Sequence, residues 1–331
     1  MKDAIEQIKN ELSVDISGEI KIGAFKLQTA KKTLLDEANK PNPKQLYMSY
    51  WTEGEVCCLF SDSNLGKSIY AVQIGVEISK QQKVILFDCE LSAKQFQMRY
   101  TDYQGNLYDF PDNFMRAEID PEGLDVNNIN DCIIGSIEEL AIRTGTKVII
   151  IDNISYMCIE SEKAEAAGSL MSSLIGLKKK HGWSILILAH TPKRSLSNPI
   201  TQNDLAGSKK LFNFFDSVFA IGKSAKDGSL RYIKQIKNRN FAFDDIEVRV
   251  CSIEKEGAFL HFADRGISTE KEHLKEVTEK EANDLETQIL YCIKQGKSYR
   301  DTAAQLGVSK SKVETVVKKS KSNKTNELNF T

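Results

Sequence analysis

The sequence predicts an α/β fold built around a mostly parallel β-sheet. Five short, near-continuous apolar runs are typical of strands that are buried on both faces. They cover residues 55–60, 83–88, 147–152, 184–189 and 217–222. Helix-like segments alternate with them, at about 67–80, 93–102, 127–143, 165–180 and 204–215. The composition, with 41% hydrophobic and 27% charged residues, is ordinary for a soluble globular protein.

The pattern changes after residue 230. Three strand-like runs, RYIKQIK, DIEVRVCSI and GAFLHF, are joined by short polar turns and predict an antiparallel extension of the sheet. The first 44 residues are polar and end in ANKPNPKQ, which is typical of an extended connector. The predicted organisation is an N-terminal segment with connector (1–45), an α/β core (46–263), a charged linker (264–284), a small all-α module (285–321) and a tail (322–331).

Composition excludes several classes of protein. No apolar run approaches the ~20 residues of a membrane helix, and the N-terminus MKDAIEQIKN lacks the apolar core of a secretory signal. The seven cysteines are scattered without metal-like pairing, and we expect most of them to be small core residues in a reducing compartment. We therefore expect a cytoplasmic protein that does not bind membranes.

A candidate phosphate-binding loop follows the first buried strand. The segment SDSNLGKS fits the P-loop pattern, except that Ser61 replaces the first glycine. In such a loop, backbone N–H groups surround the phosphates and the next helix points its N-terminus at the anion. Lys67 is expected to reach the β- and γ-phosphates, and the Ser68 hydroxyl to ligate Mg²⁺. The predicted ATP-binding residues are Ser61, Asp62, Ser63, Asn64, Leu65, Gly66, Lys67, Ser68 and Ile69.

Two acids are expected beside this loop. Asp152 ends the run KVIIID, where a carboxylate can hold the water shell of a magnesium ion. Hydrolysis also needs a base that orients the attacking water. Glu90, two residues past a strand end, is the candidate base, and Asp88 competes with it. The implied cofactors are ATP and Mg²⁺.

The stretch KVILFDCELSAKQFQMRY resembles the corresponding segment of the bacterial replicative hexameric helicases (DnaB-like) and of the wider RecA-type P-loop ATPases. The resemblance covers about residues 48–262 and implies a RecA-like core in which Glu90 is the catalytic glutamate. It also implies that His190, at the end of SILILAH, senses the γ-phosphate. The replicative helicases usually have Gln there, whereas the related plasmid-type (RepA-like) hexameric helicases have His.

The same resemblance implies an arginine that acts in trans. YIKQIKNRNF is similar to the strand end that carries Lys-x-Arg and reaches the ATP site of the neighbouring subunit, and Lys237 and Arg239 match that spacing. Such an arginine stabilises charge on the transferred phosphoryl group and ties hydrolysis to assembly. We therefore expect a homo-oligomer, with a hexamer as the expected ring. A basic edge strand that prevents aggregation is the alternative interpretation.

Two loops are expected to face DNA, because in RecA-like rings the loops after the third and fourth core strands line the central channel. They cover about residues 155–168 and 191–209. The first is mildly acidic, whereas the second has basic side chains suited to phosphate contact, namely Lys193, Arg194, Lys209 and Lys210. Ala206 stands where the helicases have a basic channel residue. A flexible, solvated loop is the alternative.

The C-terminal residues predict three helices arranged as a helix-turn-helix. Apolar residues recur at helical spacing, Gly307 makes the turn, and Ser309 can cap the third helix. Residues 286–331 hold nine Lys and Arg against four Asp and Glu, although the whole chain has a net charge of −1. The third helix would present Lys310, Ser311, Lys312 and Thr315 to the major groove of DNA, with Lys318, Lys319 and Lys321 on phosphates. Three-helix units also dock proteins, but the basic excess favours DNA.

These observations favour an ATP-hydrolysing, DNA-associated RecA-like motor that resembles plasmid and replicative helicases. Such a motor would act in DNA replication or mobile-element processing. One alternative is a DNA-binding regulator in which ATP switches assembly without unwinding. A strand-exchange recombinase is the third alternative.

Overall fold

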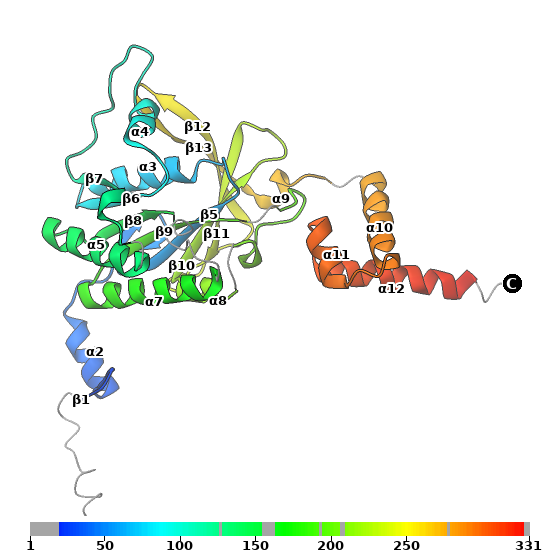
Figure 1. Cartoon of the computed structure of the whole chain (residues 1–331), viewed down its shortest axis with the longest axis horizontal. Coiled ribbons are helices and arrows are strands. Elements are labelled where there is room, and N and C mark those ends of the chain that lie inside the picture. The colour runs from blue at the N-terminus through cyan, green and yellow to red at the C-terminus, as the bar shows by residue number, and fades with distance from the viewer. Residues whose placement is uncertain are drawn as a thin grey trace, which may run out of the picture. The chain divides into compact units, whose positions relative to one another are not determined.

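The computed structural model describes residues 20–125, 128–153, 163–191, 194–205, 209–276 and 279–327, with their side chains except those at 163–167, 209–210, 279–283 and 321–327 (Figure 1). The chain divides into two compact units, Met1–Lys44 and Gln45–Thr331. No helix in the described part of the chain is long and apolar enough to cross a membrane.

The N-terminal unit contains a small hairpin and one helix. Strands β1 (Ile20–Ile22) and β2 (Phe25–Leu27) pair antiparallel, and α2 (Ala30–Ala38) follows. The Thr29 side chain caps this helix by accepting a hydrogen bond from the backbone N–H of Lys32. A connector is all that the sequence predicts here, because neither β2 nor α2 buries a face that would give an apolar period.

A large sheet forms the centre of the second unit. Over the described residues it has nine strands, in the order β13-β12-β11-β10-β5-β9-β8-β6-β7. Every neighbouring pair from β10 to β7 is parallel, whereas β11, β12 and β13 continue the sheet antiparallel. The strands are β5 (Val56–Ser61), β6 (Val84–Asp88), β7 (Phe114–Glu118), β8 (Val148–Asp152), β9 (Ser184–His190), β10 (Ser217–Lys223), β11 (Leu230–Lys237), β12 (Glu247–Glu256) and β13 (Phe259–Thr269). The predicted α/β fold with its antiparallel extension is confirmed.

Helices cover both faces of the sheet. In Figure 1, α3 and α4 lie above the sheet, and α5, α7 and α8 lie below it. Their bounds are α3 (Lys67–Ser79), α4 (Ala93–Arg99), α5 (Ile129–Thr144), α7 (Lys163–His181) and α8 (Lys209–Phe214). Each corresponds to a predicted helical segment, although α8 begins later than expected, after the short 3-10 turn η2 (Gln202–Asp204). A second 3-10 turn, η1 (Pro121–Gly123), precedes α5.

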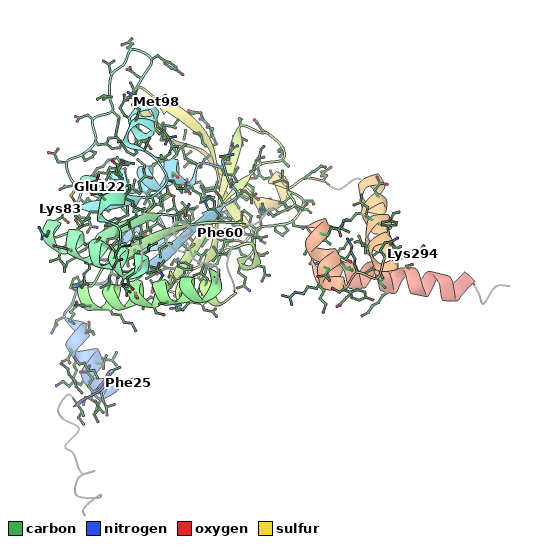
Figure 2. All side chains as sticks on the ribbon, viewed as in Figure 1. Phe25, Phe60, Lys83, Met98, Glu122 and Lys294 are labelled. Atoms are coloured by element: carbon green, nitrogen blue, oxygen red, sulfur yellow. The ribbon has the colours of Figure 1, made fainter. Side chains whose placement is uncertain are left out.

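Two apolar layers fix the helices on the sheet. On the α3 side, Tyr70 and Ile74 pack against strand residues and against the small hairpin β3 (Gln45–Tyr47) and β4 (Trp51–Thr52). On the other side, Ile137 of α5 and Leu174 of α7 belong to the same layer as Phe60 of β5, which Figure 2 labels. Each such buried side chain stabilises the fold by roughly 1.5–3 kcal/mol. The strand ends are therefore held rigidly relative to one another.

Two strands differ from the prediction. β7 was not expected, because only its first residue, Phe114, is fully buried and its sequence FMRAE has no continuous apolar run. β13 continues to Thr269, past the predicted end of the core at residue 263, because β12 pairs with it as far as Glu247. The short helix α9 (Glu270–His273) follows. The predicted linker 264–284 therefore begins with the end of a strand and a short helix.

The C-terminal residues form three helices with their own apolar core. They are α10 (Glu279–Lys294), α11 (Tyr299–Leu306) and α12 (Lys310–Glu327). Gly307, with a φ of 65°, makes the turn between α11 and α12, and the Ser309 hydroxyl accepts a hydrogen bond from the Lys312 backbone N–H. The buried residues are Ile289, Ala303, Val313, Val316 and Val317. The predicted helical elements and core are thus present.

Candidate active site

Polar residues that end four central strands meet at one edge of the sheet. Ser61 at the end of β5 lies beside His190 at the end of β9, and Asp88 at the end of β6 lies beside Asp152 at the end of β8. We call this the carboxyl edge, defined by these four residues. Open parallel sheets bind their ligands outside the carboxyl ends of the strands. The elements that were singled out in separate parts of the sequence therefore form one site.

The loop between β5 and α3 has the backbone of a phosphate cradle. Asn64 and Gly66 adopt positive φ angles of 63° and 94°. A Cβ atom at Gly66 would lie 2.8 Å from the Ile253 side chain and 3.0 Å from Phe262, so both the φ angle and the space require glycine. Ser61, in contrast, still pairs with β9 as a regular strand residue. This explains why Ser61 can replace the usual first glycine.

Lys67 is the first residue of α3 and is buried, with 7% of its surface exposed. Its ammonium group donates hydrogen bonds to the Ser61 carbonyl oxygen and to Nδ1 of His190, each at 3.1 Å. Burial lowers the pKa of Lys67, whereas the carboxylates of Asp152 and Glu90 oppose this effect. The cation is therefore held at the cradle among groups of opposite charge.

Asp152 and Ser68 fit a magnesium ion. Asp152 is 2% exposed, and its carboxylate is hydrogen-bonded by the Ser68 side chain. Burial raises the pKa of Asp152 to about 7, and the neighbouring carboxylates of Glu90 and Asp88 add to this effect. A divalent cation would favour ionisation of such an acid, and Mg²⁺ typically takes one or two protein oxygens together with phosphates and water.

The contacts of Asp88 and Glu90 separate the two candidate bases. Asp88 is 3% exposed, accepts the backbone N–H groups of Glu90 and Leu91 through Oδ1, and accepts Arg116 Nε at 2.9 Å through Oδ2. Its hydrogen-bonding capacity is used to hold the turn after β6. The Glu90 side chain is 40% exposed and faces His190 and Asn153. Glu90 is therefore the carboxylate that is available to a water molecule at the cradle.

Asn153 joins the site, although nothing in the sequence analysis indicated it. The residue is 2% exposed, and its Nδ2 donates to Oε1 of Glu90 and lies 2.9 Å from Nε2 of His190. The Lys67 ammonium can only donate, so Nδ1 of a neutral His190 accepts and Nε2 carries the proton. Nε2 then donates to Oε1 of Glu90 at 3.3 Å. Two N–H groups converge on one oxygen of the candidate base.

Lys237 and Arg239 lie at the opposite edge of the sheet. Arg239 donates to Oδ1 of Asp216 at 2.7 Å, and Oδ2 of Asp216 accepts the backbone N–H of Val56, the first residue of β5. We call this the amino edge, defined by Val56, Asp216 and Arg239. Lys237 donates to the carbonyl oxygens of α8 and of the residue after it. Because β5 has six residues and rises about 3.3 Å per residue, the two edges are roughly 17–20 Å apart. Arg239 cannot reach the P-loop of its own chain.

The basic residues predicted to face DNA differ in their surroundings. Arg194 has a side chain that is only 7% exposed and lies 3.8 Å from Asp62 of the P-loop. Its contacts therefore give no support to a role on DNA. Lys193 lies outside the described residues, as does most of the loop 155–168. Lys209 and Lys210 lie on α8, but their side chains are not described.

One face of α12 is polar and exposed. Its buried residues Val313, Val316 and Val317 point into the module. The four residues predicted to enter the major groove are all exposed, namely Lys310, Ser311, Lys312 and Thr315. Lys318 and Lys319 are exposed as well. The helix thus separates its apolar side from a basic side.

Together, the parallel sheet, the cradle and the buried acid define a P-loop nucleotide-binding α/β domain. The sequence matches the protein family described as "AAA domain" over residues 24–195, more than half of the chain. The chain belongs to this family, and membership supports ATPase activity. No curated protein matches the sequence.

The chain is also similar to a solved structure of the ATPase domain of a helicase. The similarity has a TM-score of 0.54 and 11% sequence identity, and it covers 70% of this chain and 98% of that one. At such low identity the similarity concerns the fold, and the predicted RecA-like fold of the core is confirmed by it.

Proposed function

We propose that this protein is an ATP-hydrolysing motor that assembles with copies of itself, associates with DNA, and acts like the plasmid and replicative helicases it resembles. One observation carries the proposal. The cradle with Lys67, Asp152 and Glu90 lies at the carboxyl edge, whereas Arg239 lies at the amino edge of the same chain. An ATP site completed by Arg239 therefore needs a second copy, whose amino edge faces the first copy's cradle.

The residues of the carboxyl edge have complementary tasks in hydrolysis. The loop N–H groups and Lys67 bind the phosphates of ATP, and Ser68 and Asp152 hold Mg²⁺, which neutralises charge on the β- and γ-phosphates. Glu90 orients the attacking water and accepts its proton. Lys67 contacts both the Ser61 carbonyl and His190, so movement of Lys67 onto the phosphates frees His190. His190 is then available to contact the γ-phosphate.

Arg239 has the properties of a residue that acts on another chain. Its side chain is 53% exposed and is oriented by Asp216 and by the Asn213 carbonyl. Lys237 is more enclosed and lies over the Phe212 ring, which supports the strand end before Arg239. We propose that Arg239 stabilises charge on the γ-phosphate bound by the neighbouring subunit, with Lys237 as its support.

DNA association is proposed on the basis of α12. The exposed side of this helix carries Lys310, Lys312 and Lys318 next to small hydroxyl residues, and its apolar side packs against α10 and α11. This arrangement suits a recognition helix with phosphate-contacting lysines. The loop 191–209 is kept as a second DNA contact through Lys193, Lys209 and Lys210.

The proposal is tested by the ATPase rate per subunit as a function of protein concentration. We expect this rate to rise with concentration, because each site is completed by a neighbour, and to rise further with single-stranded DNA. A rate per subunit that stays constant on dilution to monomer, measured by light scattering in the same samples, would contradict the trans arrangement.

A regulator without unwinding activity is the second candidate. It is favoured by the internal position of Arg194, which removes one cation from the channel loop, and by the concentration of described exposed lysines on α12. A strand-displacement assay separates the two candidates. Displacement of a labelled strand supports the motor, whereas DNA-stimulated ATP turnover without displacement supports the regulator.

A further inference from the structure

A row of buried polar side chains connects the P-loop to the segment that leaves the core. The row begins at Asp62, whose Oδ1 accepts a hydrogen bond from the Thr191 hydroxyl. Oδ2 of the same carboxylate lies 3.8 Å from Nε of Arg194. Because Asp62 follows the last residue of β5, any shift of the phosphate cradle moves the partner of Arg194.

The row continues through Tyr232 to Glu270. Arg194 donates through its terminal nitrogen to the Tyr232 hydroxyl at 3.4 Å, and this hydroxyl donates to Oε1 of Glu270 at 3.2 Å. A hydroxyl can accept and donate at once, so the direction of the two bonds is consistent. Tyr232 is fully buried and Glu270 is 3% exposed. We call these four residues, Asp62, Arg194, Tyr232 and Glu270, the polar row.

Glu270 fixes both the loop after β9 and the start of the exit segment 270–276. Its Oε1 accepts the backbone N–H of Ile200 at 2.7 Å, and its Oε2 accepts the ammonium group of Lys234. Further along, the backbone N–H of Lys275 donates to the Leu196 carbonyl at 3.0 Å. The backbone carbonyl of His273 accepts the N–H of Ala225 at 2.8 Å. The exit segment is therefore bonded to the same loop that contains Arg194.

Stability alone does not account for this arrangement. A buried carboxylate, guanidinium and ammonium must each be desolvated, and apolar residues of similar volume often stabilise a core equally well or better. A continuous row of partners does, however, fix the relative position of its ends. Here the ends are the cradle and the segment that precedes the C-terminal helices.

We propose that Arg194 is a positioning residue of the phosphate cradle, and that the polar row transmits the state of the cradle to the exit segment 270–276. This inference rests on the proposed function, because it requires that the cradle binds ATP. Arg194 acts through Asp62 and does not itself touch the nucleotide or DNA. Nucleotide binding that repositions Asp62 tightens the row and holds the exit segment on the loop after β9.

The Tyr232→Phe substitution tests the row with a single atom. It removes the hydroxyl that joins Arg194 to Glu270 and keeps the buried ring. The matched control is Tyr100→Phe, because the Tyr100 ring is 2% exposed and its hydroxyl has no hydrogen-bond partner among the described residues. The readout is hydrogen–deuterium exchange at the backbone N–H of Ala225 and Lys275 in the full chain, with and without Mg²⁺ and a non-hydrolysable ATP analogue.

We expect the analogue to slow exchange at both amides by about 5-fold or more in the natural protein and in Tyr100→Phe, a typical size for coupling between two sites. In Tyr232→Phe the slowing should fall below about 2-fold. Equal slowing in all three proteins would overturn the proposal. Binding of the analogue is measured in the same samples. Bound analogue without any slowing in the natural protein refutes only the row, whereas absent binding refutes the proposed function and the row together.

Arg194→Met and Arg194→Lys test the positioning role by steady-state kinetics without DNA. We expect KM for ATP to rise about 10-fold in Arg194→Met with kcat within about 3-fold, and Arg194→Lys to recover part of this rise because it keeps the charge but not the planar guanidinium. An unchanged KM together with weaker DNA binding would overturn the proposal and restore Arg194 as a DNA contact. A merely structural loss lowers the active fraction, and thus kcat, without this change in KM.

Discussion

The two edges of the central sheet solve different problems with similar residues. At the carboxyl edge, Lys67, Asp152 and Asn153 are buried and bonded to one another, so the geometry exists within one chain. At the amino edge, the Arg239 side chain is 53% exposed and is held only on one side, by Asp216 and Asn213. Buried groups are placed for a ligand that enters, whereas an exposed, oriented group is placed for a partner that arrives.

The electrostatics of the two edges differ in the same way. Burial raises the pKa of Asp152 to about 7. Burial would also raise the pKa of Asp216, but hydrogen bonds from Lys178 and from the Val56 backbone more than compensate and lower it. The carboxyl edge therefore holds an acid that is unsatisfied until a cation binds, and the amino edge holds one that is already paired. This difference separates a ligand site from a structural support.

Arg239→Ala gives the largest expected effect and tests whether the amino edge acts on another chain. We expect kcat to fall about 10³-fold or more, with ATP binding retained, because an arginine supplied in trans stabilises only the transition state. Arg265→Ala is the control, since that side chain is 46% exposed and pairs with Glu254 within the hairpin of β12 and β13. Retained turnover in Arg239→Ala would remove the trans role.

Glu90→Gln is expected to lower kcat by about 10²- to 10³-fold without raising KM, because it removes the group that accepts the proton from water. Glu118→Gln is the control at the same edge, since Glu118 is paired with Arg116 at 3.0 Å. Turnover within about 10-fold of the natural protein would point to another base.

Mixing the two inactive variants sharpens the comparison of the edges. In a random 1:1 mixture, about a quarter of the interfaces would combine an intact Glu90 with an intact Arg239 from the neighbour. We therefore expect ATPase activity to reappear on mixing, although each variant alone is inactive. Absence of any recovery, in samples shown to exchange subunits, would place both residues in one chain's site.

The sequence predicts the carboxyl edge well because its signals are local. A continuous apolar run followed by a polar residue marks a buried strand end, and this places Asp152, His190 and Ser61 at the same edge. Asn153 was missed because a residue beside a predicted acid carries no spacing signal of its own. Its role depends on Glu90 and His190, which are far away in sequence and come together only in the folded sheet.

Features that depend on long-range contacts were harder to predict. A cation in a polar loop predicts exposure, so Arg194 was interpreted as a DNA contact, whereas its pairing with Asp62 and Tyr232 buries it. The opposite location of Arg239 follows from strand register, which spacing does not contain. The strand β7 was missed because an edge strand that is only partly buried lacks a continuous apolar run.

Two Asp→Asn substitutions test the electrostatic difference between the edges. The raised pKa of Asp152 means that its carboxyl reduces stability increasingly as pH rises from about 4 to about 7, so Asp152→Asn should raise the melting temperature at pH 8 in the absence of Mg²⁺ and nucleotide. The lowered pKa of Asp216 means that its carboxylate stabilises the fold above about pH 4, so Asp216→Asn should lower the melting temperature at pH 8.

Thermal melts at pH 5 and pH 8 check both signs. The gain in Asp152→Asn should shrink at pH 5, where the natural carboxyl is already protonated, and the loss in Asp216→Asn should amount to about 1–3 kcal/mol because it leaves Lys178 without its charged partner. Mg²⁺ with an ATP analogue should stabilise the natural protein more than Asp152→Asn. The same sign of change in both variants at pH 8 would contradict the proposed contrast.

The smallest expected effect tests whether DNA binds away from both edges. Replacing Lys310 and Lys312 by Ala should weaken DNA binding about 10-fold and reduce the slope of log K against log salt by about 2, because two phosphate or base contacts are lost. The control replaces Lys294 and Lys297, which belong to the same three-helix module but lie before α11 (Figure 2). Basal ATPase activity without DNA should stay unchanged in both double variants, since neither alters an edge of the sheet. Equal weakening in both would mean that net charge attracts DNA without a defined face, and unchanged affinity in both would move DNA binding to the loop 191–209.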